Sequence, residues 1–267
     1  MFKIIGTDLD GTLLRNDKSI SQYTKDVLQQ ATEKGVEFVI CTGRMYKALQ
    51  YILPELPFCR YSVTIMGAEI YDVKENKVIY SEPLDAQYVD FLIKYGLENN
   101  LHVQIYIDNE LYTNSSDKYS EYYFQNTTVN GIEVDDLAAF AKGKTVAKVL
   151  FIDEIDVIEK HINNLREIMQ GKINICNSDL HYLECSSLNA RKDVAMNYLT
   201  SALGYKKDEL IVFGDSGNDL LMLKNTGFSC VTQNGTDEAK AVADLIIESN
   251  EDDGVAKTVE RLILNGE

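Results

Sequence analysis

The sequence predicts an α/β protein: a Rossmann-like, doubly wound parallel sheet core with an inserted α+β domain. In the first and last thirds of the chain, short apolar runs alternate with helical segments that carry one apolar face. The middle third instead shows helices beside strands that come in pairs. Alternating strands and helices favour a parallel sheet, whereas paired strands are typical of α+β structure.

The first third predicts three strands separated by two helices. Ser21 can cap the first helix and Gly35 can end it. Pro54 should stop the second helix, because proline cannot continue one. The expected elements are a strand over 3–7, a helix between 21 and 35, a strand over 36–40, a helix over 44–53 and a strand over 61–66.

The last third resumes the alternation with short apolar strands. The expected elements are a helix over 191–203, a strand over 210–213, a helix over 220–224, a strand over 228–231, a helix over 238–242, a strand over 245–247 and a helix from 254 onward. These strands would complete the parallel sheet begun in the first third.

The middle third is predicted to be a second domain inserted into the first. Pro83 marks its entry, and the turn at 186–189 its exit. Its expected elements are a helix over 84–98, a hairpin over 101–107 and 110–113, a strand over 146–152, a helix over 155–169 and strands over 173–176 and 182–185. We therefore expect a core of residues 1–82 and 185–267 and an inserted domain of residues 83–184.

The composition narrows the classes of partner. The 267 residues include 42 Asp and Glu against 26 Lys and Arg, a net charge of −16, and no basic segment interrupts this excess. Nucleic acid and anionic membranes are therefore not expected partners, since both are recognised by positive charge. An anionic small substrate would require a site that supplies its own cations.

Other features favour a cytoplasmic protein. No apolar run reaches 18 residues, so no transmembrane helix is expected. Asp8 falls where a signal peptide would need apolar residues. The five cysteines are scattered, without a C-x-x-C pair, which argues against a disulfide framework and a zinc site.

The strongest candidate for chemistry is the segment Asp8-Leu9-Asp10-Gly11-Thr12, directly after the first strand. Alternating carboxylates in a turn can aim at one point. A calcium loop of the EF-hand type would need Gly at its sixth position and Glu at its twelfth, and Leu13 and Ser19 stand there. A Walker B aspartate would need an accompanying phosphate-binding loop motif, which the sequence lacks.

Three further features follow other predicted core elements, and each is weaker alone. Thr42-Gly43-Arg44 opens a segment after the second strand and could bind an anion, although threonine is also a common helix cap. Lys192 stands at the start of a helix, where most lysines are simply solvated. In the loop 214–219, Asp215 could cap the next helix instead of binding a ligand.

Electrostatics links these features into one site. If the four aspartates of the two acidic loops converge, their repulsion would raise some of their pKa values. One Mg²⁺ ion together with Lys192 would offset most of this charge. Carboxylate and water oxygens are the ligands that Mg²⁺ prefers, and it often shares its coordination with a substrate phosphate. The four aspartates are Asp8, Asp10, Asp215 and Asp219.

The ordered set D-x-D-G-T, T-G-R, Lys192 and G-D-x-x-N-D resembles the haloacid dehalogenase superfamily of phosphohydrolases over nearly the whole chain. The inserted segment resembles the large C2-type cap of the Cof-like subfamily, and the tail 249–256 is similar to that subfamily's ending. The resemblance implies a Rossmann-like core, a cap domain and Mg²⁺ as cofactor.

The resemblance also implies a role for each site residue. Asp8 would be the nucleophile that forms an aspartyl-phosphate, and Asp10 the general acid and then the base. The metal ligands would be Asp8, the backbone carbonyl of Asp10, and Asp215. The residues implied to hold phosphate are Thr42, Gly43, Lys192 and Asn218, with Asp219 positioning Lys192 or the metal's water shell. Arg44 could bind a second anionic group of the substrate or be an ordinary helix residue.

Two positions depart from the subfamily's pattern. Met66-Gly67-Ala68 stands where Asn-Gly-Ala is usual, which removes an amide from the edge of the site. Asp193 replaces a common glycine after Lys192, and we expect this change to alter only the surface of the helix.

The expected function is Mg²⁺-dependent hydrolysis of a small phosphorylated metabolite, a sugar phosphate or a phosphorylated cofactor, by a monomer or weak homodimer. A phosphotransferase such as a sugar phosphomutase would use the same intermediate, so the sequence leaves it as an alternative. A non-catalytic sensor of phosphorylated metabolites is a second alternative, which the retention of Asp10 disfavours.

Overall fold

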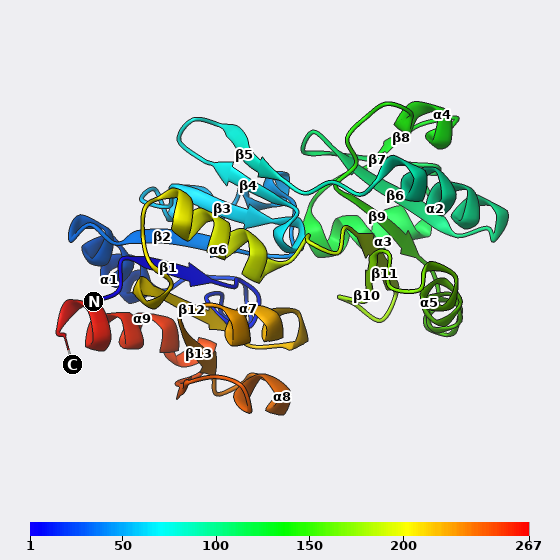
Figure 1. The fold of residues 1–267 in the computed structure, drawn as a ribbon. Coiled ribbons are helices and arrows are strands. Elements are labelled where there is room, and N and C mark those ends of the chain that lie inside the picture. The colour runs from blue at the N-terminus through cyan, green and yellow to red at the C-terminus, as the bar shows by residue number, and fades with distance from the viewer. Residues whose placement is uncertain (267) are drawn as a thin grey trace. The chain divides into compact units, whose positions relative to one another are not determined.

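A computed structural model describes residues 1–266, which form two compact units (Figure 1). The core unit comprises residues 1–43, 49–80 and those from Arg191 onward, and the inserted unit comprises Arg44–Ala48 and Ser81–Ala190. The inserted unit reaches beyond the predicted range of 83–184, because its last strand, β11 (Tyr182–Ser186), pairs along its whole length within the inserted sheet.

The core unit contains an eight-stranded sheet in the order β14-β13-β12-β1-β2-β3-β4-β5. The strands are β1 (Ile4–Thr7), β2 (Glu37–Cys41), β3 (Tyr61–Thr64), β4 (Glu69–Asp72), β5 (Lys77–Ser81), β12 (Leu210–Gly214), β13 (Phe228–Thr232) and β14 (Leu245–Ile247). The six strands from β14 to β3 pair in parallel, and β4 pairs antiparallel with β3. The predicted fold class is confirmed.

The strand order also fixes where the loops meet. β1 lies between β2 and β12. The first third of the chain extends the sheet on one side of β1, and the last third extends it on the other side. Thr7, the last residue of β1, is in register with Ile40 of β2 and Phe213 of β12. The loops after these three strands therefore share one edge of the sheet, at the topological switch point where open α/β sheets bind ligands.

The core helices cover the sheet with apolar faces. They are α1 (Gln22–Glu33), α6 (Lys192–Ala202), α7 (Leu220–Asn225), α8 (Asp237–Lys240) and α9 (Gly254–Val259). The Ser21 side chain caps α1 by accepting a hydrogen bond from the Thr24 amide, as predicted. Val27, Leu28 and Ala31 form the buried face of that helix.

Two predicted elements of the first third are wrong in detail. Residues 44–53 do not form an α-helix but contain the 3₁₀ turn Tyr46–Leu49 and the start of a second, Leu53–Glu55. Most apolar side chains of this segment are buried, so tertiary packing overrides local helix propensity. β3 ends at Thr64 instead of residue 66, because Ile65 and Met66 both have positive φ.

The inserted unit has a six-stranded sheet in the order β10-β11-β9-β6-β7-β8. Its remaining strands are β6 (His102–Ile107), β7 (Glu110–Thr113), β8 (Ile132–Glu133), β9 (Lys148–Ile152) and β10 (Asn174–Cys176), and its helices are α2 (Ala86–Glu98), α3 (Lys118–Thr127), α4 (Leu137–Ala141) and α5 (Ile155–Met169). Val103, Ile105 and Phe151 pack with apolar residues of α2 and α5 on one face of this sheet. The opposite face carries polar and apolar side chains together, among them His102, Gln104 and Leu150, which are all buried.

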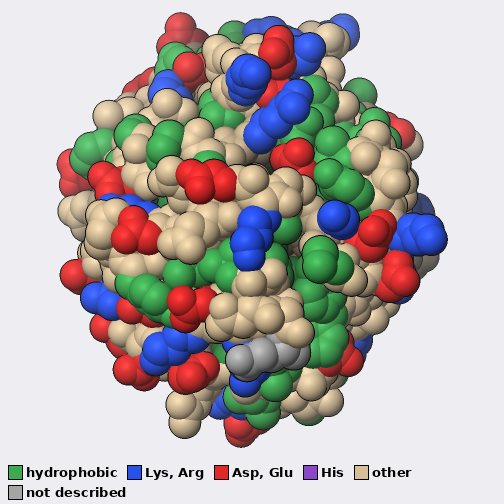
Figure 2. All heavy atoms as spheres, turned by 90° about the vertical axis from the view of Figure 1, so that its left-hand side faces the viewer, with side chains coloured by type: hydrophobic (Ala, Val, Ile, Leu, Met, Phe, Trp, Pro, Cys, Tyr) green, Lys and Arg blue, Asp and Glu red, His purple; other side chains and the backbone are tan. Residues whose placement is uncertain are grey.

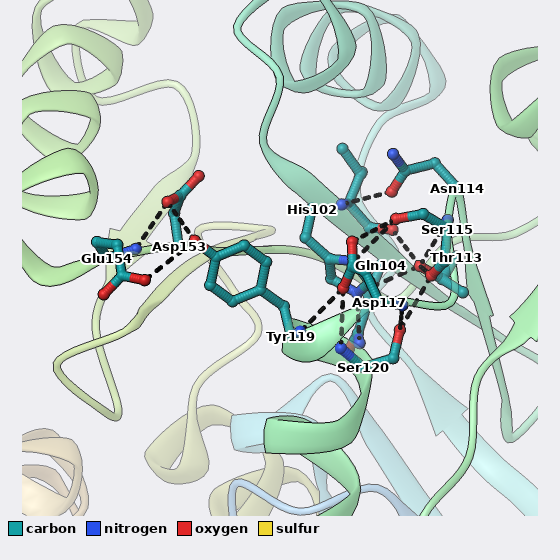
Figure 3. Close-up of polar contacts among 11 residues, drawn as sticks. His102, Gln104, Thr113, Asn114, Ser115, Asp117, Tyr119, Ser120, Asp153 and Glu154 are labelled. Atoms are coloured by element: carbon teal, nitrogen blue, oxygen red, sulfur yellow. Dashed lines mark hydrogen bonds and ion pairs between the residues drawn. The ribbon is translucent and has the colours of Figure 1, made fainter.

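One polar network ties α3 to that opposite face (Figure 3). Asp117 caps α3 by accepting hydrogen bonds from the Tyr119 and Ser120 amides. The buried His102 ring lies 3.1 Å from the Asp117 carboxylate, and Ser115 donates to the same carboxylate at 2.7 Å. Burial, partly offset by Asp117, lowers the pKa of His102. The network therefore fixes the start of α3 against β6 and β7.

The face drawn in Figure 2 intersperses acidic, basic and hydrophobic side chains. Within residues 1–266, no helix has both the length and the apolar character needed to cross a bilayer.

Candidate active site

The first acidic loop begins at the carboxyl end of β1. The Asp8 amide donates a hydrogen bond to the Phe213 carbonyl at 3.0 Å, which continues the pairing of β1 with β12 by one residue. The Asp8 side chain is buried. The parallel register therefore places this carboxylate beside the loop after β12.

Lys192 contacts two carboxylates in this region. Its Nζ atom donates to Asp8 Oδ1 at 2.6 Å and to Asp219 Oδ1 at 2.7 Å, and the side chain is only 1% exposed. Its position at the start of a helix did not by itself distinguish Lys192 from a solvated lysine, and it was predicted as a site residue from the charge balance and from the resemblance. Its burial between two carboxylates instead makes it a fixed positive charge at the centre of the site.

Asp219 organises the loop that follows β12. Its Oδ2 atom accepts hydrogen bonds from the backbone amides of Asp215 at 3.1 Å and Ser216 at 3.4 Å, while Oδ1 contacts Lys192. A Cβ atom at Gly214 would lie 2.7 Å from Asp219 Cβ, so glycine is needed for this close approach. Asp219 thus links Lys192 to the backbone that carries Asp215.

Asp215 is held by the first loop. The Thr12 hydroxyl donates to Asp215 Oδ1 at 3.2 Å. Gly11 has a φ of +81°, and a Cβ atom there would lie 2.7 Å from Asp215 Oδ2. No role was predicted for Thr12, although its place at the end of the D-x-D-G-T motif was a signal for one.

Burial and the neighbouring charges shift the pKa values of three groups of the site. Burial, opposed by Lys192 and reinforced by Asp219 and Asp215, raises the pKa of Asp8 to about 8. Burial and the charge of Asp219 raise the pKa of Asp215 to about 6. For Lys192, burial opposes the charged form, but Asp219 and Asp8 outweigh it and raise its pKa. Without a further cation, the Asp8 carboxyl group therefore favours its protonated form at neutral pH.

Three carboxylates lie close enough to share one metal ion. One side-chain oxygen from each of Asp8, Asp215 and Asp219 lies within 4.8 Å of the others. An all-oxygen set in which the pKa values of Asp8 and Asp215 are raised fits Mg²⁺, because a divalent ion offsets the repulsion that burial intensifies. Asp8 and Asp215 were predicted ligands, whereas Asp219 was predicted as a supporting residue.

Asp10 stands apart from this carboxylate group. Its side chain is 39% exposed and forms an ion pair with Lys18 at 2.8 Å. The predicted metal ligand at this position was the backbone carbonyl and not the carboxylate, so that role stays a prediction.

The residues predicted to hold phosphate are placed differently from one another. Thr42 is buried at the end of β2, where its amide donates to the Val63 carbonyl, and Gly43 follows it in the core unit. Arg44 begins the short segment that belongs to the inserted unit. Asn218 is exposed, and its Oδ1 atom accepts a hydrogen bond from Ser216. Contact of any of these with phosphate stays a prediction.

Asp193 contradicts the expectation of a surface change. Its buried carboxylate accepts two hydrogen bonds from Arg191, at 2.9 and 2.6 Å, and one from Asn225 at 2.8 Å. The side chain therefore anchors the start of α6 to α7, directly beside Lys192.

Comparison with known proteins places this site in a family. Residues 5–259 match the haloacid dehalogenase-like hydrolases. The 5-amino-6-(5-phospho-D-ribitylamino)uracil phosphatase YcsE of Bacillus subtilis is 28% identical, with 98% of this chain and 96% of that protein covered. A crystal structure of a haloacid dehalogenase-like hydrolase from Bacteroides thetaiotaomicron is 28% identical and superposes with a TM-score of 0.89, covering 98% of this chain and 100% of that one. The structure of TM0651 from Thermotoga maritima is 26% identical and also has a TM-score of 0.89, with 98% and 97% covered.

The chain therefore belongs to the haloacid dehalogenase-like hydrolases. The predicted subfamily, Cof-like, and the predicted enzyme class, phosphoric monoester hydrolase, are confirmed.

Proposed function

We propose that this protein is a Mg²⁺-dependent phosphatase that hydrolyses a small phosphomonoester through an aspartyl-phosphate on Asp8. The observation that supports this most directly is the buried Asp8 carboxylate, 2.6 Å from Lys192 and within 4.8 Å of two further aspartates. Phosphoryl transfer depends chiefly on positioning and on neutralising charge, and this arrangement supplies both.

The first half of the reaction uses Asp8 and Asp10. An Asp8 oxygen attacks phosphorus, the bond to the ester oxygen breaks, and that oxygen takes a proton from Asp10. Lys192, fixed by Asp8 and Asp219, offsets the negative charge of the transferring group. Mg²⁺ held by Asp8 and Asp215 would keep the carboxylates ionised and neutralise phosphate oxygens.

The second half regenerates the enzyme. Asp10, now a carboxylate, takes a proton from a water molecule whose oxygen attacks phosphorus. The bond to Asp8 breaks and inorganic phosphate leaves.

We further propose a sugar phosphate or a phosphorylated cofactor as the substrate class. Two relatives from Bacillus subtilis, YcsE and YitU, are both 28% identical to this chain and are named 5-amino-6-(5-phospho-D-ribitylamino)uracil phosphatases. The phosphate in that name is carried by a ribityl group, which resembles a sugar. The net charge of −16 disfavours a nucleic-acid substrate.

The test is phosphate release from a panel of phosphomonoesters, with Mg²⁺ or with EDTA. Wild-type protein should release phosphate only with Mg²⁺, and Asp8→Asn should release none, since an amide cannot form the intermediate. Asp26→Asn is the matched control, because Asp26 is exposed on α1. Release that persists in Asp8→Asn would refute the proposed nucleophile. Transfer to an added sugar without net release would instead identify a phosphotransferase.

A further inference from the structure

The segment Ile65–Gly67, directly after β3, has an unusual backbone. Its three residues have φ values of +49°, +58° and +101°, so all three lie in the left-handed region. Ile65 is β-branched and fully buried, and such residues rarely adopt this conformation. Backbone strain of this kind persists only where the surrounding structure enforces it, and it is concentrated at functional sites. We call this segment the β3 turn.

One side of the β3 turn contacts the end of β2. The Met66 amide donates a hydrogen bond to the Thr42 carbonyl at 3.1 Å. A Cβ atom at Gly43 would lie 2.8 Å from Met66 Sδ, so the thioether packs directly on this glycine. The turn therefore supports the Thr42-Gly43 segment through both backbone and side chain.

The other side contacts the start of α6. A Cβ atom on Gly67 would lie 2.2 Å from the Arg191 carbonyl carbon and 2.7 Å from the Lys192 amide nitrogen. Any side chain at position 67 would displace the peptide that carries Lys192. Asp193, the residue after Lys192, accepts hydrogen bonds from Arg191 and Asn225, which restrict the movement of this peptide.

We propose that the β3 turn is a positioning element that sets the spacing between the Thr42-Gly43 segment and Lys192. This inference rests on the proposed function, with Thr42, Gly43 and Lys192 in the phosphate-binding roles that the resemblance implies. Neither Met66 nor Gly67 needs to touch the substrate for this role. The strained backbone is what allows one short turn to contact both groups at once.

The test compares two glycine-to-alanine variants. Gly67 and Gly35 both have positive φ, so alanine strains the backbone at each, but a Cβ at Gly35 meets no atom within 4 Å. We expect Gly67→Ala to lower kcat/KM by roughly 10²-fold, the loss that a displacement of about 1 Å can cause. Gly67→Ala should also weaken the binding of inorganic phosphate, measured by calorimetry with Mg²⁺. Gly35→Ala should change neither kcat/KM nor the phosphate affinity by more than about twofold.

Three outcomes distinguish a failure of the spacing role from a failure of the proposed function. Equal phosphate affinity and turnover in the two variants, at a temperature where both are folded, would overturn the spacing role while leaving the proposed function intact. An inactive wild type would refute the proposed function, and phosphate binding would still test the spacing. Wild-type protein that binds no phosphate would overturn the spacing role as well.

A second pair keeps the test decisive if Gly67→Ala does not fold. Met66→Gly relieves the positive φ and removes the thioether from Gly43, while Asn76→Gly relieves a φ of +48° at an exposed position. We expect Met66→Gly to fold and to bind inorganic phosphate about tenfold more weakly than Asn76→Gly. Equal affinities would contradict the proposal.

Discussion

Asp10 differs from the other acidic residues of the site in its surroundings. Its carboxylate is partly exposed and paired with Lys18, whereas Asp8 and Asp219 are buried around Lys192. A proton donor and acceptor needs access to the leaving group and to water, and a metal ligand does not. The structure therefore agrees with separate roles for the two carboxylates of the first loop.

The substitution Asp10→Asn tests this separation. It should slow turnover by roughly 10²–10⁴-fold, because it removes a general acid and base. Mg²⁺ affinity, measured by calorimetry, should change little, since the carboxylate is not part of the group formed by Asp8, Asp215 and Asp219. A parallel loss of Mg²⁺ affinity and turnover would show that the Asp10 side chain serves the metal instead.

The sequence alone predicted the role of some residues of the site but not of others. The D-x-D-G-T motif and the Gly214–Asp219 loop are local patterns, so their carboxylates could be found from the sequence. The role of Gly67 could not, because its contact with Arg191 joins residues more than a hundred positions apart. The burial of Asp193 was missed because its partner Asn225 lies 32 positions later, on another helix.

Among the elements of the inserted unit, β9 and β11 share a buried ion pair. Lys148 Nζ lies 3.1 Å from Glu184 Oε2, both side chains are almost fully buried, and the Tyr106 ring lies 4.6 Å from the ammonium group. Burial opposes the charged lysine, but Glu184 outweighs it and raises the pKa of Lys148. A buried pair is costly to break because the remaining charge loses its partner.

Lys148→Met should therefore lower the free energy of unfolding by about 3–5 kcal/mol, measured by urea denaturation followed by circular dichroism. The double variant Lys148→Met/Glu184→Leu should recover most of this loss, because neither charge is then left buried alone. Lys94→Met, which breaks the exposed pair with Asp90, is the control and should cost under about 1 kcal/mol. A double variant as unstable as the single one would mean that packing, and not charge, dominates at this site.

Elements were predictable where the apolar pattern was long enough. The parallel strands and α1, α2, α5 and α6 were expected close to their observed positions. The β4–β5 pair, β8 and α4 were not, because β8 and α4 are very short and β5 is largely exposed. The 44–53 segment was expected to be helical, but its buried side chains are accommodated by 3₁₀ turns instead.

For the whole molecule, the fold was predictable because strand alternation constrains topology so strongly. A strand followed by a helix and a parallel strand has essentially one handedness, and polar loops after such strands meet at one sheet edge. The arrangement of β1 between β2 and β12 then gathers segments separated by nearly 200 residues. The contact between Asp8 and Lys192, which joins β1 to the start of α6, is not visible in any local pattern.

Because buried carboxylates lie close together in the site, the stability of the protein should depend on both pH and the binding of Mg²⁺. In metal-free protein, the pKa values of Asp8 and Asp215, about 8 and about 6, both exceed the ordinary 3.8. The folded state then retains protons that the unfolded state releases. Stability is therefore highest below about pH 4 for these two groups and falls as pH rises toward about 8.

Mg²⁺ should reverse that loss, since it binds the ionised carboxylates of the folded state only. At a concentration 100 times its Kd, a ligand adds about 2.7 kcal/mol to the free energy of unfolding, or several degrees in Tm for a chain of this size. The rise in Tm from EDTA to Mg²⁺ should be large at about pH 8 and small at about pH 5, where protons compete for Asp8 and Asp215. Scanning calorimetry at the two pH values measures this difference, and Asp215→Asn should reduce the rise at the higher pH. An equal rise at both pH values would mean that the ion does not bind at these carboxylates, because their raised pKa values couple metal binding to protons in that range.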